Sequence, residues 1–408
     1  MAFQREIPPT AGLPPFLTDL ISFDKGSLVD RASLYFNLPF FQLECSGTAA
    51  FIIILMALKK LEPNRKEVII PAYTCPLMVL AIKKCNLQIK ICDLAYENID
   101  FDFDHLANLV NEHTLAIVPT HLGGRVVDVA KAKNIAQQHG AFVIEDAAQA
   151  LGADVGQIAD VSFFSLAVGK GLSIFEGGLI SSHNTSLQHH IKQTSAQLSH
   201  FNLGWELRRT VEFIGYSFCY RPQILSFVYG HPRRKALKKQ NLIEAVGDFF
   251  DEIPIHKVGK FRQNAGFHAL TRLPQYLNDT NKQAMVRLDR LSKIKEVKVI
   301  QDQNQQGIWP FFMVLVPVEQ IRNHILDELW STPLGVSRLF IHALPDYLYL
   351  QELVPSTPVS NARDLANRMF TISNSLWLTD DLFEKICQTI ENIMNESKIY
   401  FVNADNNR

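Results

Sequence analysis

The sequence predicts an α/β fold in which a mainly parallel sheet carries helices on both faces, followed by a smaller α+β C-terminal domain. Between residues 67 and 148, short apolar runs alternate with helix-length segments, a pattern typical of βαβ units. Beyond residue 259 the chain changes to long amphipathic segments with few apolar runs. The length of 408 residues exceeds what one hydrophobic core usually serves, so we expect more than one domain.

The first 40 residues are expected to form an extended arm that packs on a partner subunit. They show no hydrophobic period, and four prolines prevent a continuous helix: Pro8, Pro9, Pro14 and Pro15. The predicted parts of the chain are the arm (1–40), the large domain (41–255), the α+β domain (256–398) and a frayed tail (399–408).

Composition excludes several classes of protein. The 40 basic and 41 acidic residues nearly cancel, so the charge favours no nucleic-acid partner. The six cysteines form no CxxC pair and have no histidine spacing typical of zinc, which predicts a reduced compartment and no metal site. Prolines interrupt the N-terminal segment where a signal peptide needs an apolar core, and no later run has the length of a membrane span. We therefore expect a cytoplasmic protein.

The first helix of the large domain begins at Ser46, Gly47 and Thr48 and continues through an apolar run. Free amide groups at a helix start, a glycine and two hydroxyls can bind an anion such as a phosphate. The alternative is ordinary capping of the helix by Ser46 or Thr48. Predicted strands follow at residues 67–73, 88–94, 115–124 and 142–148, separated by predicted helices at 76–84, 103–112 and 126–139.

An acid, a hydroxyl and an amine follow the ends of two apolar runs. Asp146 ends the run FVIED, at the edge where open α/β sheets place ligands, and Ser165 ends the run VSFFS. Lys170 follows between two glycines. One chemistry that uses this trio is catalysis with pyridoxal 5'-phosphate (PLP), in which a lysine binds the cofactor aldehyde and an acid pairs with the ring nitrogen. The alternative is a surface lysine and an aspartate that caps a helix.

Residues 185–255 form a basic and aromatic insertion. Arginines and lysines are interleaved there with tryptophan, phenylalanine and tyrosine, densest at 205–239. Such a stretch can lie on a membrane surface or bind a polyanionic substrate. The alternative is a helical hairpin that packs on the sheet or on a dimer interface.

Six motifs in a fixed order give the chain a family resemblance: SGTAA, EVIIPAYT, VPTHLGG, VIEDAAQALGA, FFSLAVGK and EGGLIS. Together they resemble the DegT-type sugar aminotransferases, a family of fold-type I PLP enzymes. The resemblance covers about residues 40–185 and, more loosely, 255–395. It implies a fold-type I PLP-transferase fold and PLP as the cofactor.

The resemblance also implies roles for single residues. Asp146 corresponds to the acid on the ring nitrogen, Gln149 to the glutamine beside the ring, and Lys170 to the Schiff-base lysine. The phosphate-binding positions correspond to Ser165, Gly47, Thr48 and Ala49, the last through its backbone amide.

Four positions differ from the family pattern or leave the role of the residue open. Cys75 stands where an aromatic residue often stacks on the ring. Lys260 and Arg262 fall in the segment that reaches the neighbouring subunit's phosphate, with lysine in place of an amide, and Arg262 is a candidate for substrate binding. His121 matches a histidine near the cofactor pocket, and a structural histidine is the alternative.

The expected function is transfer of an amino group, from glutamate, to a nucleotide-linked keto-sugar in cell-surface polysaccharide or secondary-metabolite sugar biosynthesis. The family resemblance implies a homodimer that binds a nucleotide sugar and an amino-acid donor. Two alternatives stay open. The first is a PLP-dependent sugar dehydratase, although such enzymes typically replace the lysine with histidine. The second is a non-catalytic relative that contacts a membrane or a glycan assembly through residues 205–239.

Overall fold

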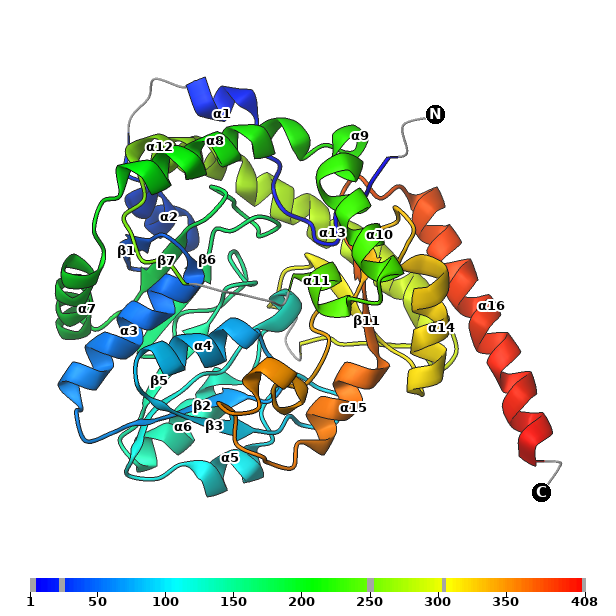
Figure 1. The fold of residues 1–408 in the computed structure, drawn as a ribbon, viewed down its shortest axis with the longest axis horizontal. Helices are drawn as coiled ribbons and strands as arrows, with labels where there is room; N and C mark the ends of the chain where they lie inside the picture. The colour runs from blue at the N-terminus through cyan, green and yellow to red at the C-terminus, as the bar shows by residue number, and fades with distance from the viewer. Residues whose placement is uncertain (1–4, 22–25, 248–252, 303–305, 406–408) are drawn as a thin grey trace.

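The computed structural model describes residues 5–21, 26–247, 253–302 and 306–405. Two sheets of different size lie side by side, and helices surround both (Figure 1). The predicted tail is helical up to residue 405, and its last three residues lie outside the described part of the chain, as do residues 248–252 of the insertion.

The larger sheet has seven strands in the order β1-β7-β6-β5-β4-β2-β3. Neighbouring strands from β3 to β6 are parallel, whereas β7 runs antiparallel to both β6 and β1. This confirms the predicted mainly parallel sheet. The strands are β1 (Phe40–Glu44), β2 (Glu67–Pro71), β3 (Gln88–Cys92), β4 (Thr114–Ile117), β5 (Phe142–Asp146), β6 (Val161–Ser165) and β7 (Gly178–Ser181).

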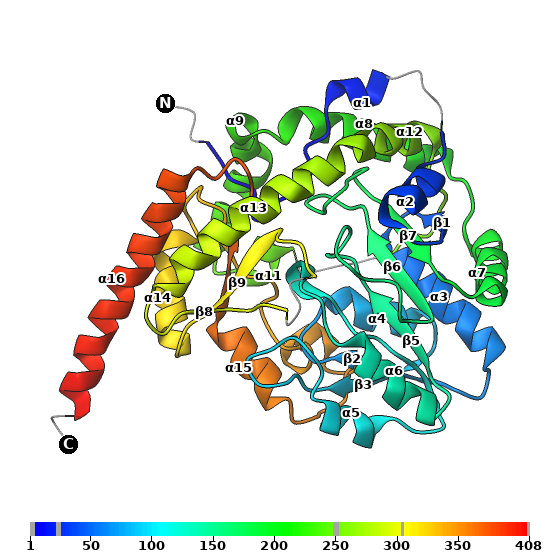
Figure 2. The ribbon, with the colours of Figure 1, turned by 180° about the vertical axis from the view of Figure 1, so that it is seen from behind.

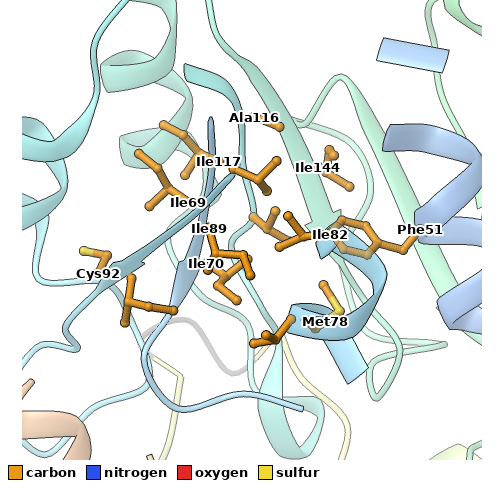
Figure 3. Packing of buried hydrophobic residues seen from close by; sticks show 14 of the residues in the cluster. Phe51, Ile69, Ile70, Met78, Ile82, Ile89, Cys92, Ala116, Ile117 and Ile144 are labelled. Atoms are coloured by element: carbon orange, nitrogen blue, oxygen red, sulfur yellow. The ribbon is translucent and has the colours of Figure 1, made fainter. Parts of the chain in front are cut away.

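Helices cover both faces of this sheet. Figures 1 and 2 view it from opposite sides, with α3 and α4 in front in the first and α6 in front in the second. A parallel strand covered on both faces is buried at every position, as β2 is. Isoleucines from β2, β4 and β5 meet Phe51 of α3 in this core (Figure 3). The helices are α3 (Gly47–Leu61), α4 (Pro76–Lys84), α5 (Phe103–Leu109), α6 (Val129–Gln138) and α7 (Thr185–Leu198).

The smaller sheet is antiparallel, in the order β10-β11-β9-β8, and has a hydrophobic core of its own. The long helix α13 (Leu273–Ser292) runs from the larger sheet toward it (Figure 2). The remaining elements are β8 (Lys298–Val299), β9 (Phe311–Leu315), α14 (Glu319–Leu329), β10 (Val336–Ser337), α15 (Ser360–Arg368), β11 (Met369–Ser373) and α16 (Asp380–Asp405).

The prediction of a fully extended arm is wrong. Residues after the prolines form α1 (Leu17–Ile21) and α2 (Leu28–Phe36). The side chain of Ser27 caps α2 by accepting a hydrogen bond from the amide of Asp30, and this capping favours a helix where the apolar pattern is weak. The segment before α1 packs on its own chain, because the Ile7 amide donates to the Pro333 carbonyl at 2.9 Å. Contact of the arm with a partner subunit stays a prediction.

The insertion is a series of helices that runs along one side of the molecule and turns into the junction between the two sheets (Figure 1). Several of its arginines form ion pairs within the chain: Arg209 contacts Glu176 and Glu212, and Arg233 contacts Glu6. The lysines Lys235 and Lys238 are exposed. No helix within the described residues is long and apolar enough to cross a bilayer. The helices after α7 are α8 (Leu203–Cys219), α9 (Pro222–Leu225), a π-helical turn (Ser226–Gly230), α10 (His231–Lys238) and α11 (Leu242–Val246).

Candidate active site

A cavity of about 370 Å³ lies at the carboxyl ends of the parallel strands, where open α/β sheets place their ligand sites. We call it the cofactor cavity. Its walls come from the start of α3, from the ends of β5 and β6 and from the loop that carries Lys170. The sequence-predicted residues that line it are Gly47, Thr48, His121, Asp146, Gln149, Ser165 and Lys170.

Asp146 ends β5 inside the protein, with 5% of its surface exposed. Its Oδ1 atom accepts a hydrogen bond from the Ala148 amide at 3.0 Å. Burial raises the pKa of this carboxyl group to about 6, against the opposing effects of the Ala148 amide, His121 and Lys170. The cavity therefore presents a buried acid that a cationic group of a ligand can stabilise in its ionised form.

Lys170 follows β6 in a loop that the N-terminal arm holds. Gly169 has a φ of +78°, and a Cβ atom there would lie 2.7 Å from the Thr10 hydroxyl oxygen, so the loop needs glycine at this point. Burial lowers the pKa of the Lys170 amine, although Cys75 and Asp146 act in the opposite direction. A desolvated lysine with a lowered pKa is more often neutral, which is the form that attacks a carbonyl.

The start of α3 and the end of β6 form the end of the cavity that suits an anion. A Cβ atom on Gly47 would lie 3.1 Å from the Cβ atom of Ser165, so glycine lets the helix start approach the strand closely. The Ser165 hydroxyl oxygen accepts from the Ala167 amide at 3.3 Å, which leaves its own proton free to donate. With Thr48 beside them, these groups can bind a phosphate.

The prediction that Ala49 offers its backbone amide to the phosphate is wrong. Its amide donates to the Ser46 hydroxyl oxygen at 3.0 Å, and that bond caps α3. Ala49 is also absent from the residues that line the cofactor cavity. Ser46 therefore caps the helix through the amide of Ala49, and Ser46, Gly47 and Thr48 all line the cavity.

Two further side chains of the cavity are held by the loop after β4. The Gly123 amide donates to the Oε1 atom of Gln149 at 2.7 Å, which fixes this amide group at the cavity wall. The Nε2 atom of His121 lies 2.8 Å from Oε1 of Glu145, and its Nδ1 atom accepts from the Val127 amide at 3.2 Å. Both ring nitrogens are thus in use, so the structure favours the structural reading of His121 over a substrate contact through these atoms.

Residues 43–217 match the model of the DegT/DnrJ/EryC1/StrS aminotransferase family. This part of the chain is similar to that family. Its members are fold-type I PLP enzymes. The GDP-perosamine synthase of Vibrio cholerae is 28% identical over 144 residues, which cover 34% of this chain and 39% of that protein. The chain thus spans about two fifths of the length of the curated relatives it matches.

Solved structures resemble nearly the whole chain. Helicobacter pylori PseC, an aminotransferase involved in the biosynthesis of pseudoaminic acid, has a TM-score of 0.71 at 14% identity, covering 95% of this chain and 100% of that one. The E. coli GDP-4-keto-6-deoxy-D-mannose-3-dehydratase with bound hydrated PLP has a TM-score of 0.66 at 17% identity, covering 90% and 92%. At these identities the likeness shows the fold alone.

The expectation that Arg262 binds substrate is wrong for the described chain. Its side chain is fully buried in α12 (Lys260–Ala269) and makes a two-point ion pair with Glu206, with Nε–Oε1 at 2.9 Å and Nη2–Oε2 at 2.6 Å. Its Nη1 atom donates to the carbonyl of Glu176 at 2.5 Å. The guanidinium group therefore joins α8, α12 and the loop before β7. Lys260 is exposed and lies outside the cofactor cavity, so its contact with a neighbouring subunit's phosphate stays a prediction.

Sequence reasoning missed several residues of the cavity, among them Thr74 and Phe340. The hydroxyl of Thr74 is buried and has no hydrogen-bond partner among the described residues, and Thr74 lies on the cavity wall. Its place in the motif EVIIPAYT was the available signal. Phe340 reaches the same cavity from the loop after β10. No sequence signal predicts this contact, because it depends on how the two sheets lie against each other.

Proposed function

We propose that this chain is a PLP-dependent aminotransferase that moves an amino group from an amino-acid donor, glutamate, to the keto group of a nucleotide-linked sugar. The match of residues 43–217 to the family model supports the reaction class, and the relatives' names support the sugar acceptor. The observation that carries the proposal is that the buried side chains of Lys170 and Asp146 line one cavity, where each shifts the pKa of the other.

The residues of the cofactor cavity fit PLP. The buried Asp146 carboxylate would hold the ring nitrogen in its protonated form, because a cation beside it offsets the cost of its burial. Gly47, Thr48 and Ser165 would hold the phosphate. The hydroxyl of Thr74, which has no hydrogen-bond partner among the described residues, is one more group to which a bound molecule can form a hydrogen bond. When bound, PLP supplies an electron sink for cleavage of a carbon–hydrogen bond of the amino acid.

Lys170 has two tasks in this scheme. Burial lowers the pKa of its amine, which favours the neutral form that would hold the cofactor through its aldehyde. Nζ could also hold a proton and deliver it, which is general acid–base catalysis. Asp146 and Ser165 would hold the two ends of the cofactor and so fix its orientation toward this amine. Gln149, held by the Gly123 amide, restricts the space beside them.

Chemical trapping tests the proposal. The purified protein is incubated with PLP and reduced with borohydride, and we expect the pyridoxyl mass on the peptide that contains Lys170. Lys170→Ala should lose this label, whereas Lys192→Ala, which changes an exposed lysine of α7, should keep it. A wild-type protein that takes up no PLP, or is labelled only on other lysines, contradicts the proposal.

The products identify the reaction. With glutamate and a panel of nucleotide-linked keto-sugars, we expect a sugar in which an amine replaces the carbonyl oxygen. A sugar that loses a hydroxyl group without gaining nitrogen would instead identify a dehydratase. The retained Lys170 favours transfer, because the dehydratases that resemble this family typically have histidine at that position.

A further inference from the structure

The insertion builds a second cavity of about 580 Å³ outside the cofactor cavity, which we call the aromatic chamber. Its walls come from α8 and the residues after it, from the N-terminal arm and from the Lys170 loop. The residues that line it are Pro8, Pro9, Thr10, Val168, Gly169, Phe175, Glu212, Gly215, Tyr216, Cys219, Tyr220, Leu225, Val228 and Tyr229. Its volume falls within the range of small-molecule sites, about 300–1,000 Å³.

A third cavity lies between the aromatic chamber and the site of Lys170. This cleft cavity, also of about 580 Å³, is lined by Lys170, Gln149 and Cys75 on one side. On the other side it shares wall residues with the aromatic chamber: Pro9, Thr10, Val168, Gly169, Val228 and Tyr229. The two cavities are therefore neighbours, and a ligand with one group at Lys170 and another in the chamber would have to pass these shared residues.

The walls of the aromatic chamber select for uncharged groups. Tyr216, Tyr220, Tyr229 and Phe175 supply ring surfaces, which stack on or pack edge-on against planar rings. Glu212 is the one charged residue among the described residues that line it. Its carboxylate is already paired with Arg208 at 3.0 Å and Arg209 at 2.6 Å. No cation lines the chamber within the described residues, so it does not suit a phosphate.

The Tyr216 hydroxyl is a polar group of the chamber that makes no well-formed hydrogen bond within the described residues. It is buried, and Gly169, Ser173 and Tyr220 lie near it. The hydroxyl of the neighbouring Tyr220, by contrast, donates to the carbonyl of Thr10 at 3.4 Å. A buried hydroxyl without a partner is costly, so Tyr216 indicates a ligand that carries a matching polar atom.

We propose that the aromatic chamber binds a planar, uncharged ring of the amino acceptor, with a polar atom of that ring hydrogen-bonded to Tyr216. The reacting carbonyl of the same molecule then lies in the cleft cavity beside Lys170. That the ligand is the amino acceptor rests on the proposed aminotransferase function. That the ligand carries a planar, uncharged ring rests on the chamber alone. A nucleobase and a ring outside a nucleotide share this chemistry.

Binding is tested without PLP and without substrates, so its failure is separate from failure of the proposed function. Phenol and toluene are the probes, since they have the same ring and differ in the hydroxyl group. In a Cys75→Ser background, Cys219 is the half-buried cysteine and the four others are buried, so its rate of reaction with a thiol reagent reports on the chamber. We expect phenol to slow this reaction at least fivefold and to bind about tenfold more tightly than toluene.

Two matched pairs of variants show whether the probe binds in the aromatic chamber and contacts Tyr216. Tyr216→Phe should bring the affinity for phenol down to that for toluene, whereas Tyr220→Phe, whose hydroxyl already has a partner, should preserve the preference. Gly215→Phe, at a chamber-lining position where a Cβ atom meets nothing within 4 Å, should weaken both probes about tenfold. Gly204→Phe changes another glycine of α8 that does not line the chamber and should have no effect.

Steady-state kinetics then show whether the chamber binds the donor or the acceptor. Competition experiments show which kind of ring it binds. Gly215→Phe should raise KM for the acceptor at least tenfold and leave the half-reaction with glutamate unchanged. Competition by free nucleoside identifies a nucleobase, and competition by phenol without competition by nucleoside identifies another ring. Three results would each overturn the proposal. Phenol and toluene could bind with equal affinity, or 1-octanol could slow the reaction of Cys219 more than phenol does. Cys219 could also fail to react at all because a second copy of the chain fills the chamber.

Discussion

Glu145 and Asp146 are consecutive residues at the end of β5, and the pKa values of their carboxyl groups are displaced in opposite directions. Their side chains point to opposite faces of the strand. Burial would raise the pKa of Glu145, but His121, the Gly156 amide and the Ser162 hydroxyl outweigh it and lower that pKa. On the other face, burial dominates and raises the pKa of Asp146. The end of β5 thus carries a carboxylate held by hydrogen bonds, Glu145, and a buried carboxyl group, Asp146, whose ionised form a cationic ligand can stabilise.

Asp146→Asn should stabilise the cofactor-free protein above pH 6. In the unfolded chain this carboxyl group ionises near pH 3.8, and in the folded protein near 6. The free energy of unfolding therefore falls as the pH rises between these values, by about 3 kcal/mol in total, and the variant avoids this loss. Thermal unfolding at pH 4 and pH 8 checks this prediction. An increase in unfolding temperature over wild type that is equal at both pH values would contradict it.

Asp146→Asn should also lose PLP, because it removes the carboxylate proposed to pair with the ring nitrogen.

Glu145→Gln is the matched change one residue earlier and should have the opposite effect. The lowered pKa of Glu145 contributes stability above the unfolded pKa, and this stability disappears as the pH falls through the folded pKa. The variant should therefore be less stable than wild type at pH 8, with the difference shrinking in acid. Equal unfolding temperatures for both proteins at pH 8 would show that the His121–Glu145 contact contributes nothing.

The ion pair of Arg262 and Glu206 should matter for folding and not for substrate affinity. Arg262→Met leaves the Glu206 carboxylate buried without its partner, so we expect a loss of about 3–5 kcal/mol in the free energy of unfolding. Arg208→Gln breaks an exposed pair and should cost less than about 1 kcal/mol. Denaturant unfolding measures both. If Arg262→Met is as stable as wild type but has a raised KM for a substrate, Arg262 binds substrate after all.

Thr74→Val should separate stability from cofactor binding. The Thr74 hydroxyl is buried and has no hydrogen-bond partner in the described part of the chain, so its removal should leave the cofactor-free protein unchanged or stabilise it by up to about 1–3 kcal/mol. If this hydroxyl binds PLP, the variant should bind the cofactor about fivefold to tenfold more weakly, as measured by spectrophotometric titration. Thr74→Ser keeps the hydroxyl and should bind normally. Unchanged affinity in Thr74→Val would remove Thr74 from the site.

Gly12→Ala should disturb the Lys170 loop from a distance in sequence. A Cβ atom on Gly12 would lie 2.8 Å from the carbonyl oxygen of Lys170, and neither backbone can move easily because the Leu13 amide donates to the Gly171 carbonyl. We expect weaker borohydride-trapped labelling of Lys170. Gly204→Ala adds the same methyl group to α8 and should label like wild type. Normal labelling of Gly12→Ala would mean that the arm does not position this loop.

Local patterns in the sequence predict much of the larger sheet and of the cofactor cavity. Apolar runs and the turn residues between them fix where strands end, and parallel strands end at one edge, so Asp146, Ser165 and Lys170 could be expected to meet there. The order of the family motifs added the roles of these residues. The arm was mispredicted because its helix α2 depends on capping by Ser27 more than on apolar period.

Only the tertiary structure decides the partners of the polar groups. Arg262 pairs with Glu206, 56 residues away, and Glu6 of the arm pairs with Arg233, 227 residues away. No period or motif encodes such pairs, because they depend on where separate segments meet. The same holds for the insertion: its sequence is basic and aromatic, and in the fold some of its arginines pair within the chain while its aromatic residues line part of the aromatic chamber. Strand and helix propensities are local, whereas burial and charge pairing are set by the whole fold.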